Sequence, residues 1–191
     1  MVKLGTAALL LALAPLLAGC VSERNAQDLE RNEIRGMEIR QLIGEFRYMR
    51  DSELVNAAYR LAHMQEFAYP QLREALRSDD FHTRANVIYT FSLVGDRRNI
   101  EYIRPLLDDE SPVVRYEAAS SLVGMGDPTG FATLVEGLAD PNIRWRFKCF
   151  ESLRDATGRD FGYRHDADPT VRAPAVERWR GWLDEHRASA L

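Results

Sequence analysis

The sequence predicts an all-α protein, a short solenoid of stacked helical hairpins with a capping helix at each end. Three observations carry this prediction, and all show a period of 31 residues. Apolar residues recur at Leu72, Ile103 and Leu134, and N-cap residues recur at Asp80, Ser111 and Asn142. A glycine–aspartate pair recurs at 95–96 and 126–127. A fixed period of this length indicates repeats that bury their apolar faces by stacking on one another.

Residues 1–19 are predicted to be a signal peptide rather than part of the fold. A short positive start ends at Lys3, and a nearly uninterrupted apolar run covers 4–16. The run is too short to span a bilayer comfortably. It ends in Leu17-Ala18-Gly19-Cys20, which resembles a bacterial lipobox. The resemblance implies cleavage before Cys20 and acylation of that residue, and the alternative is an ordinary signal followed by a chance cysteine.

Acyl chains on Cys20 would hold the protein at a membrane, because two or three chains bind far more firmly than one. In the Gram-negative lipoprotein pattern, Asp after the cysteine retains the protein at the inner membrane, and this chain has Val21. The resemblance therefore implies an outer-membrane lipoprotein facing the periplasm. Residues 20–36 are polar and charged, and we interpret them as a tether with partial helical character. Beyond them, Ile39, Leu42, Ile43 and Phe46 form one apolar helical face, predicted to cap the array.

Helical repeats are predicted over 37–156, and a loop with a closing helix over 157–191. Successive hairpins place glycine at the end of the first helix and aspartate at the start of the second. Pro112 and Pro128 stand at first helical positions, where proline is tolerated. Pro105 instead falls inside the helix predicted for 98–108, so we expect a kink or a shortened helix there. Val176, Trp179 and Leu183 form the apolar face of a closing helix predicted for 173–185.

The segment 109–127 resembles a HEAT-like repeat of the short bacterial type. Arg115-x-x-Ala118-Ala119-x-x-Leu122, followed by Gly126-Asp127, carries this resemblance, which extends loosely over about 51–156. The family implies an α-solenoid that usually binds proteins. Some relatives are bilin lyases, and others are iron enzymes with paired His-Glu motifs. This chain has no His-Glu dipeptide, so its residues do not support the iron enzymes, and only the fold supports the lyases.

The second helices of such hairpins usually line the concave face, which makes their outward positions candidates for protein binding. Tyr102 is expected to be an exposed aromatic, and exposed aromatics are common interface anchors. The alternative is a solvated face. The candidate residues are Gln71, Glu74, Tyr102, Thr133 and Glu136.

A ladder of arginines also follows the period, at Arg84, Arg115 and Arg146. It offers either an anion site or, as we favour, pairs with loop carboxylates such as Asp109 and Asp140. Cys149 is predicted to be a buried, inert thiol. An oxygen-rich loop could hold a divalent metal, but its spacing is not that of a calcium loop, and we favour a solvated loop. Its residues are Asp160, His165, Asp166 and Asp168.

These observations favour a lipid-anchored protein-binding or scaffold module of the bacterial cell envelope. The partner is an unknown envelope protein, and the membrane is engaged through the acyl chains. The net charge of −4 argues against nucleic acid. We expect no catalytic residues, cofactor or metal. The alternatives are an enzyme or assembly chaperone acting on envelope substrates, and a structural part of an envelope complex.

Overall fold

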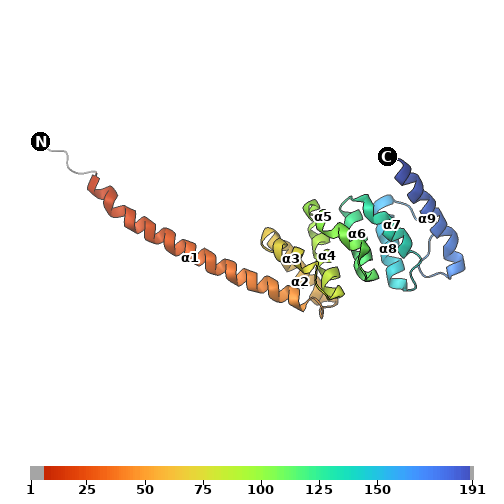
Figure 1. The fold of residues 1–191 in the computed structure, drawn as a ribbon, viewed down its shortest axis with the longest axis horizontal. Coiled ribbons are helices and arrows are strands. Elements are labelled where there is room, and N and C mark those ends of the chain that lie inside the picture. Colours follow the sequence, from red (N-terminus) through yellow and green to blue (C-terminus); the bar gives the residue numbers. More distant parts are fainter. Residues whose placement is uncertain (1–6, 190–191) are drawn as a thin grey trace. The chain divides into compact units, whose positions relative to one another are not determined.

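The computed structural model describes the backbone of residues 7–189 and the side chains of residues 25–186. All regular structure in that range is helical, and the chain divides after Gln41 into two units (Figure 1). The first helix is α1 (Ala7–Glu45). The second unit then contains α2 (Asp51–Met64), α3 (Tyr69–Ala75), α4 (Phe81–Val94), α5 (Ile100–Ile103), α6 (Pro112–Gly124), α7 (Phe131–Gly137), α8 (Ile143–Thr157) and α9 (Pro169–Ser189). Four 3₁₀ segments join them: η1 (Gln65–Phe67), η2 (Arg97–Asn99), η3 (Arg104–Asp108) and η4 (Pro128–Gly130).

Helix α1 covers segments that the sequence divided into signal, tether and cap. Its backbone is helical from Ala7, without a break at Gly36. Residues 21–36 contain no proline and many strong helix formers, which explains why the tether is fully helical. Residues 1–6 of the predicted signal and the side chain of Cys20 lie outside the described part. Within the described residues, no helix is both long and apolar enough to span a membrane.

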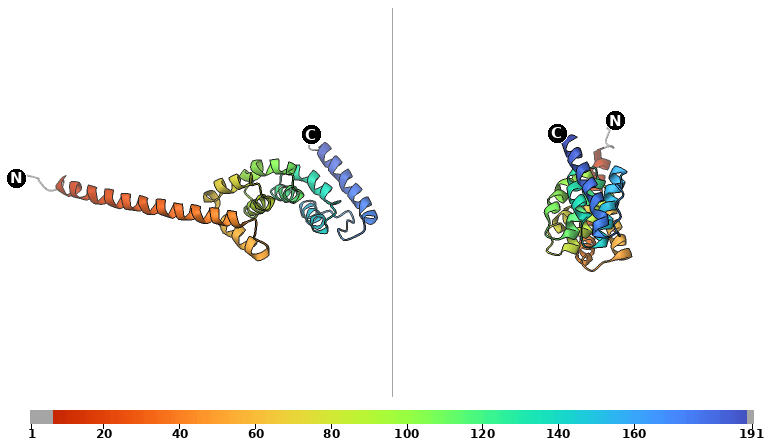
Figure 2. Two further views of the ribbon diagram at one scale, coloured as in Figure 1. Left: turned by 60° about the horizontal axis from the view of Figure 1, so that its bottom comes forward. Right: turned by 90° about the vertical axis from the view of Figure 1, so that its right-hand side faces the viewer.

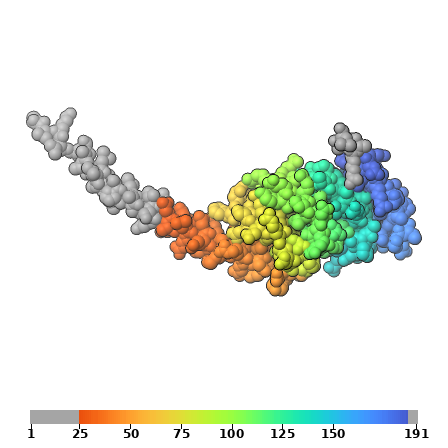
Figure 3. All heavy atoms as spheres, in the orientation of Figure 1, coloured from red at the N-terminus to blue at the C-terminus, as the bar shows by residue number. Residues whose placement is uncertain are grey.

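The second unit is built in two layers, as the repeat predicts. The first helices of the hairpins pack in chain order, α2 on α4, α4 on α6 and α6 on α8. The second helices form the other layer, each preceded by a 3₁₀ turn. In the left-hand view of Figure 2, α4, α6 and α8 are seen nearly end-on beneath that layer. Figure 3 shows the hairpins as adjacent bands of colour from α2 to α9.

A continuous apolar seam joins the hairpins at the predicted positions. Leu72, Ile103 and Leu134 are each completely buried, as are Val87 and Leu122 of the first-helix layer. Full burial of a side chain of this size stabilises the folded state by about 1.5–3 kcal/mol. The seam therefore extends through successive repeats rather than forming separate cores.

The helix ends confirm most of the predicted caps. The side chains of Asp80 and Asn142 accept hydrogen bonds from Thr83 N and Arg144 N. Ser111 occupies the equivalent N-cap position, but its side chain makes no capping bond. The side chain of Asp109 accepts from the Ser111 amide instead (2.9 Å). The prediction for Ser111 was therefore right in position and wrong in the bond.

The two predicted glycine turns end their helices differently. Gly95 has φ 65° and its amide bonds to Phe91 O, a simple left-handed cap. Gly126 has φ 80° and lies two residues beyond the last helical residue of α6. Its amide bonds to Val123 O, and the Asp127 amide bonds to Leu122 O, which together form a Schellman motif.

Pro105 shortens its helix, as its position predicts. Helix α5 ends at Ile103, and the chain continues as the 3₁₀ segment η3. Proline has no amide hydrogen for the bond that would continue the α-helix. The second helix of this hairpin is therefore only one α-helical turn between two 3₁₀ segments.

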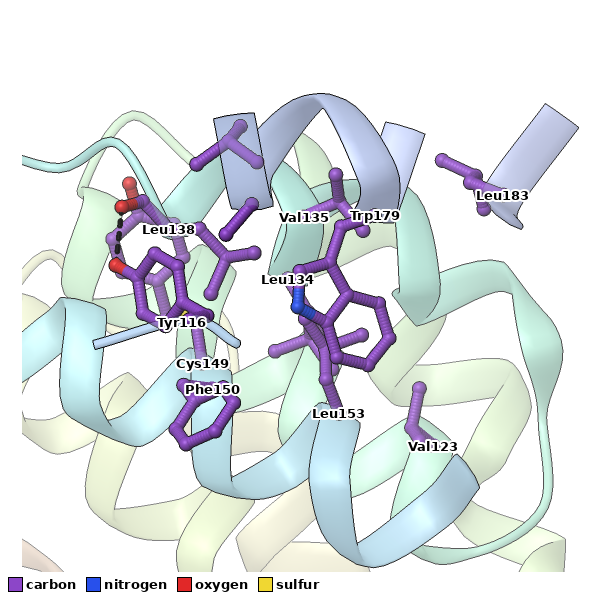
Figure 4. Packing of buried hydrophobic residues seen from close by; sticks show 14 residues of the cluster. Tyr116, Val123, Leu134, Val135, Leu138, Cys149, Phe150, Leu153, Trp179 and Leu183 are labelled. Atoms are coloured by element: carbon purple, nitrogen blue, oxygen red, sulfur yellow. Dashed lines mark hydrogen bonds between the residues drawn. The ribbon is translucent and has the colours of Figure 1, made fainter. Parts of the chain in front are cut away.

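Helix α9 closes the array with the predicted face. Val176, Trp179 and Leu183 are buried in one cluster with Leu134 and Leu138 (Figure 4). The indole of Trp179 is completely buried and meets the ring of Phe161 edge-on, with centroids 4.8 Å apart. The helix begins at Pro169, four residues before the predicted start, because proline is well suited to the first helical position.

Candidate functional site

An open groove with a volume of about 830 Å³ crosses the second-helix layer of the second unit. Its walls come from three consecutive repeats: η1 and α3, then η2, α5 and η3, then the turn leading into η4. The lining residues are Glu66, Arg73, Arg97, Arg98, Ile100, Glu101, Arg104, Gly126, Asp127, Pro128 and Thr129. We call this feature the arginine groove.

The period of the chain builds the groove from equivalent positions. Arg73 and Arg104 are 31 residues apart, as are Arg98 and Thr129. Glu66, Arg97 and Pro128 form a similar series. Because equivalent positions of stacked repeats lie side by side, these residues lie along a line that crosses the layer. The sequence shows this 31-residue spacing, but most of the residue types change from one repeat to the next. The groove positions are therefore harder to recognise in the sequence than the core, cap and ladder positions.

The central arginine of the groove is held by carboxylates of two repeats. Arg98 lies 2.6 Å from both Glu66 and Asp96. Asp96 also accepts hydrogen bonds from the Arg98 backbone amide (3.0 Å) and the Tyr69 hydroxyl (3.1 Å). Hydrogen bonds from the Arg98 side chain, followed by that from its backbone, lower the pKa of Asp96 to about 2. Asp96 is therefore ionised at any physiological pH.

The third repeat contributes the carboxylate of Asp127, which is buried. It caps η4 by accepting from the Thr129 amide and hydroxyl, and it lies 2.5 Å from Arg104. Burial raises the pKa of Asp127, but the hydrogen bonds from Thr129 and Arg104 outweigh that effect and lower it. Each oxygen of this carboxylate therefore has an internal partner.

Arg73 is positioned by an amide and by aromatic rings. Its Nε and one terminal nitrogen donate to Asn99 Oδ1 (3.1 and 3.0 Å). Its guanidinium carbon lies 4.2 Å from the ring centroid of Tyr102 and 5.5 Å from that of Tyr69. A cation over an aromatic face is favourable by about 0.5–2 kcal/mol. Asn99 Nδ2 is buried without a partner among the described residues.

Arg97 and Glu101 differ from the other charged residues of the groove. Both are exposed, and neither forms a hydrogen bond or ion pair with another described side chain. The Arg97 guanidinium lies beside Gly126 of the next repeat, 3.9 Å from the position that a Cβ on this glycine would take. Arg97 therefore presents an uncommitted cation at the junction of two repeats.

The five predicted binding residues lie outside the lining of the arginine groove. Tyr102 is half-buried rather than exposed, because Arg73 covers one face of its ring. Glu74 and Glu136 are exposed, and Thr133 is half-buried. Gln71 is half-buried, and its Oε1 is buried without a partner among the described residues. None of these five residues lines the groove, although Glu74 and Tyr102 are chain neighbours of the lining residues Arg73 and Glu101.

The arginine ladder clamps the loops between hairpins. In each repeat, one terminal nitrogen donates to the carbonyls five and six positions earlier: Arg84 to Asp79 and Ser78, Arg115 to Glu110 and Asp109, Arg146 to Pro141 and Asp140. Only Arg84 forms the predicted carboxylate pair, with both oxygens of Asp109 (2.7 and 2.8 Å). Asp140 accepts instead from the Tyr116 hydroxyl (2.8 Å), and Arg146 from α8 donates to His165 O.

The two remaining sequence candidates are structural. Burial raises the pKa of the Cys149 thiol to about 12, as expected for an inert side chain. In the oxygen-rich loop, Asp160 bonds to the Gly162 amide, and the ring of His165 contacts Phe147. Asp166 pairs with Arg164 (3.3 Å). Among the described residues, no group of three or more His, Cys, Asp or Glu side chains is arranged to hold a metal ion.

Two layers of stacked hairpins, a continuous seam and a closing helix define an α-solenoid repeat protein. The family model described as HEAT repeats matches residues 47–154, more than half of the chain. The chain belongs to the HEAT-repeat family.

A solved structure gives the same fold. The chain is similar to one in the complex of CpcE and CpcF of phycocyanin lyase from Nostoc sp. PCC7120, with 22% identity and a TM-score of 0.52. The similarity covers 74% of this chain and 97% of that chain. The comparison with curated proteins gives no match.

Proposed function

We propose that this protein is a lipid-anchored binding or scaffold module of the bacterial cell envelope, and not an enzyme. The HEAT-repeat solenoid supports this proposal because such arrays present extended surfaces to other proteins. The observation that carries it is the arginine groove, a wide surface feature assembled from three repeats. Arg98 and Arg104 are held on separate carboxylates rather than converging on a single reacting atom.

The lipobox-like residues before Cys20 support the location. Acylated Cys20 would hold the protein at the outer membrane, facing the periplasm, and raise its local concentration near envelope partners. Cys20→Ala tests this part by membrane fractionation. The variant should leave the outer-membrane fraction, as a soluble or signal-retaining species. A variant that still fractionates with the outer membrane would remove the support for lipidation.

Binding on the second-helix layer is tested by site-specific photo-crosslinking in cells. A photoreactive residue at Gln71 or Glu74 should give discrete protein adducts. The same residue at Val171, which is 62% exposed on α9, is the control and should not. Adducts at all three positions, or at none, would contradict a binding role for this face.

A catalytic role is the alternative, by analogy of fold with the similar chain from the phycocyanin lyase complex. At 22% identity this similarity supports the fold alone. An enzyme or assembly chaperone acting on envelope substrates would show turnover of a modified substrate in extracts. The binding module would instead capture its partner stoichiometrically.

A further inference from the structure

We infer that the arginine groove takes an acidic, extended segment of the partner protein. This inference rests on the proposed binding function and specifies the chemistry of the partner. Its basis is the difference between the acids and the arginines of the groove. The acids are mostly committed to internal bonds, whereas the arginines keep donors free for a ligand.

The most buried carboxylates of this region are bonded to side chains of the protein itself. Asp127 is 6% exposed and is bonded to Thr129 and Arg104. Asp96 is bonded to Arg98 and Tyr69. These acids therefore act as supports that fix the arginine side chains, and a fixed guanidinium loses less conformational entropy when it binds a carboxylate.

The arginines retain donors that these contacts do not use. A guanidinium has five N–H donors on three nitrogens. The bonds described above use two of these nitrogens in Arg73 and in Arg98, and one in Arg104. Arg97 uses none on a described residue. Free guanidinium edges are matched geometrically by carboxylates, which they bind through paired hydrogen bonds.

The spacing of the repeat selects an extended segment. Arg73 and Arg104 occupy equivalent positions on neighbouring second helices, and packed helices lie about 8–10 Å apart. An extended chain rises about 3.3 Å per residue, so carboxylates two or three residues apart match this interval. Ile100 and Pro128 give the groove apolar surface between its charges, which suits a polypeptide.

An anionic membrane or a free phosphate fits the groove less well. The four arginines of the groove are interspersed with three carboxylates, Glu66, Glu101 and Asp127, so the groove lacks the unbroken cluster of basic residues that binds an anionic bilayer. A phosphate site would need donors converging on one point. Here Arg98 and Arg104 are each held on a different carboxylate.

The test measures binding of fluorescent hexaglutamate to the full-length protein in detergent, by anisotropy at low and physiological salt. We expect binding that weakens with salt and falls by about tenfold or more in Arg97→Glu, because one charge-assisted contact becomes repulsive. Glu101→Lys should strengthen binding. Arg144→Glu, at an exposed position outside the groove, is the matched control and should not change it.

Several results would overturn the inference. They are an absence of hexaglutamate binding, equal losses in Arg97→Glu and Arg144→Glu, or equal binding of hexaglutamine. Arg97-dependent binding of phosphatidylglycerol vesicles or inorganic phosphate without hexaglutamate binding would overturn it in favour of those ligands. If hexaglutamate fails while adducts still form at Gln71 or Glu74, only this inference fails. If the adducts are absent, the proposed function fails.

Discussion

At the scale of single residues, one ladder position combines two kinds of contact. Arg84 clamps its own loop through carbonyls and also reaches Asp109 of the next repeat, and both side chains are more than nine-tenths buried. Arg115 and Arg146 clamp their loops through carbonyls in the same way, but neither pairs with a carboxylate among the described residues. Breaking a buried ion pair leaves an unpaired buried charge, which costs more than losing bonds at the surface.

Arg84→Ala is therefore expected to lower the free energy of unfolding by about 3–5 kcal/mol. Arg115→Ala, at a half-buried position with carbonyl partners alone, should cost about 1 kcal/mol or somewhat more. Urea unfolding followed by circular dichroism compares the two variants. Equal destabilisation would show that the carboxylate adds nothing to the clamp.

Asp96 gives a pH dependence at the same scale. Its pKa is lowered from 3.8 to about 2 in the folded protein, chiefly by hydrogen bonds from the Arg98 side chain. A lowered pKa stabilises the folded state above pH 3.8, and this contribution is lost as the pH falls toward 2. Asp96→Asn should flatten the acid dependence of the melting temperature between these pH values. An unchanged acid profile would contradict the assigned bonds.

At the scale of elements, two glycines let the segment η4–α7 approach its neighbours. A Cβ on Gly130 would overlap the Ala119 carbonyl oxygen, and one on Gly137 would overlap Cys149 Sγ. Gly130 ends η4 and Gly137 ends α7, so the two glycines lie seven residues apart along this segment. One faces α6 and the other α8, which explains how this short segment fits between two first helices.

Gly130→Ala should destabilise the protein by about 1–3 kcal/mol, because backbone must move to admit the methyl group. Gly124→Ala is the matched control: nothing lies within 4 Å of its added Cβ. The control should be as stable as the parent or up to about 1 kcal/mol more stable, since alanine favours helix. Thermal unfolding measures both, and a neutral Gly130→Ala would refute the close approach.

At the scale of the whole second unit, we expect the stability of each hairpin to depend on the element that packs against it. Each repeat contacts its neighbours, so a defect in the closing helix acts first on the hairpin it covers. Trp179 fills the space between α9 and the last repeats and is completely buried. Trp179 therefore joins the closing helix to the continuous apolar seam of the array.

Trp179→Ala is expected to cost about 3–5 kcal/mol. Hydrogen exchange should rise most in α7 and α8 and least in α2. Val171→Ala, on the exposed side of the same helix, should leave exchange unchanged. Uniform acceleration across all helices would indicate a single cooperative unit instead of a graded array.

The sequence was informative wherever a residue type repeated with one structural role. The seam, the caps at Asp80 and Asn142, and the shortened helix at Pro105 all follow from local chemistry that each repeat satisfies again. The arginine groove follows the same period, but its residues differ from repeat to repeat. The partners of individual side chains were harder still to predict. Asp140 bonds to Tyr116, for example, because a tyrosine stands where the previous repeat has Ala85.

The loop clamps restrict where this chain can change length. Each ladder arginine reaches two carbonyls at fixed separations of five and six residues, with bonds of 2.7 to 3.2 Å. A residue inserted between arginine and carbonyls would carry the acceptors out of hydrogen-bond range. Insertions and tags will therefore be tolerated poorly at these three junctions, whereas the addition of an entire hairpin would leave each clamp intact.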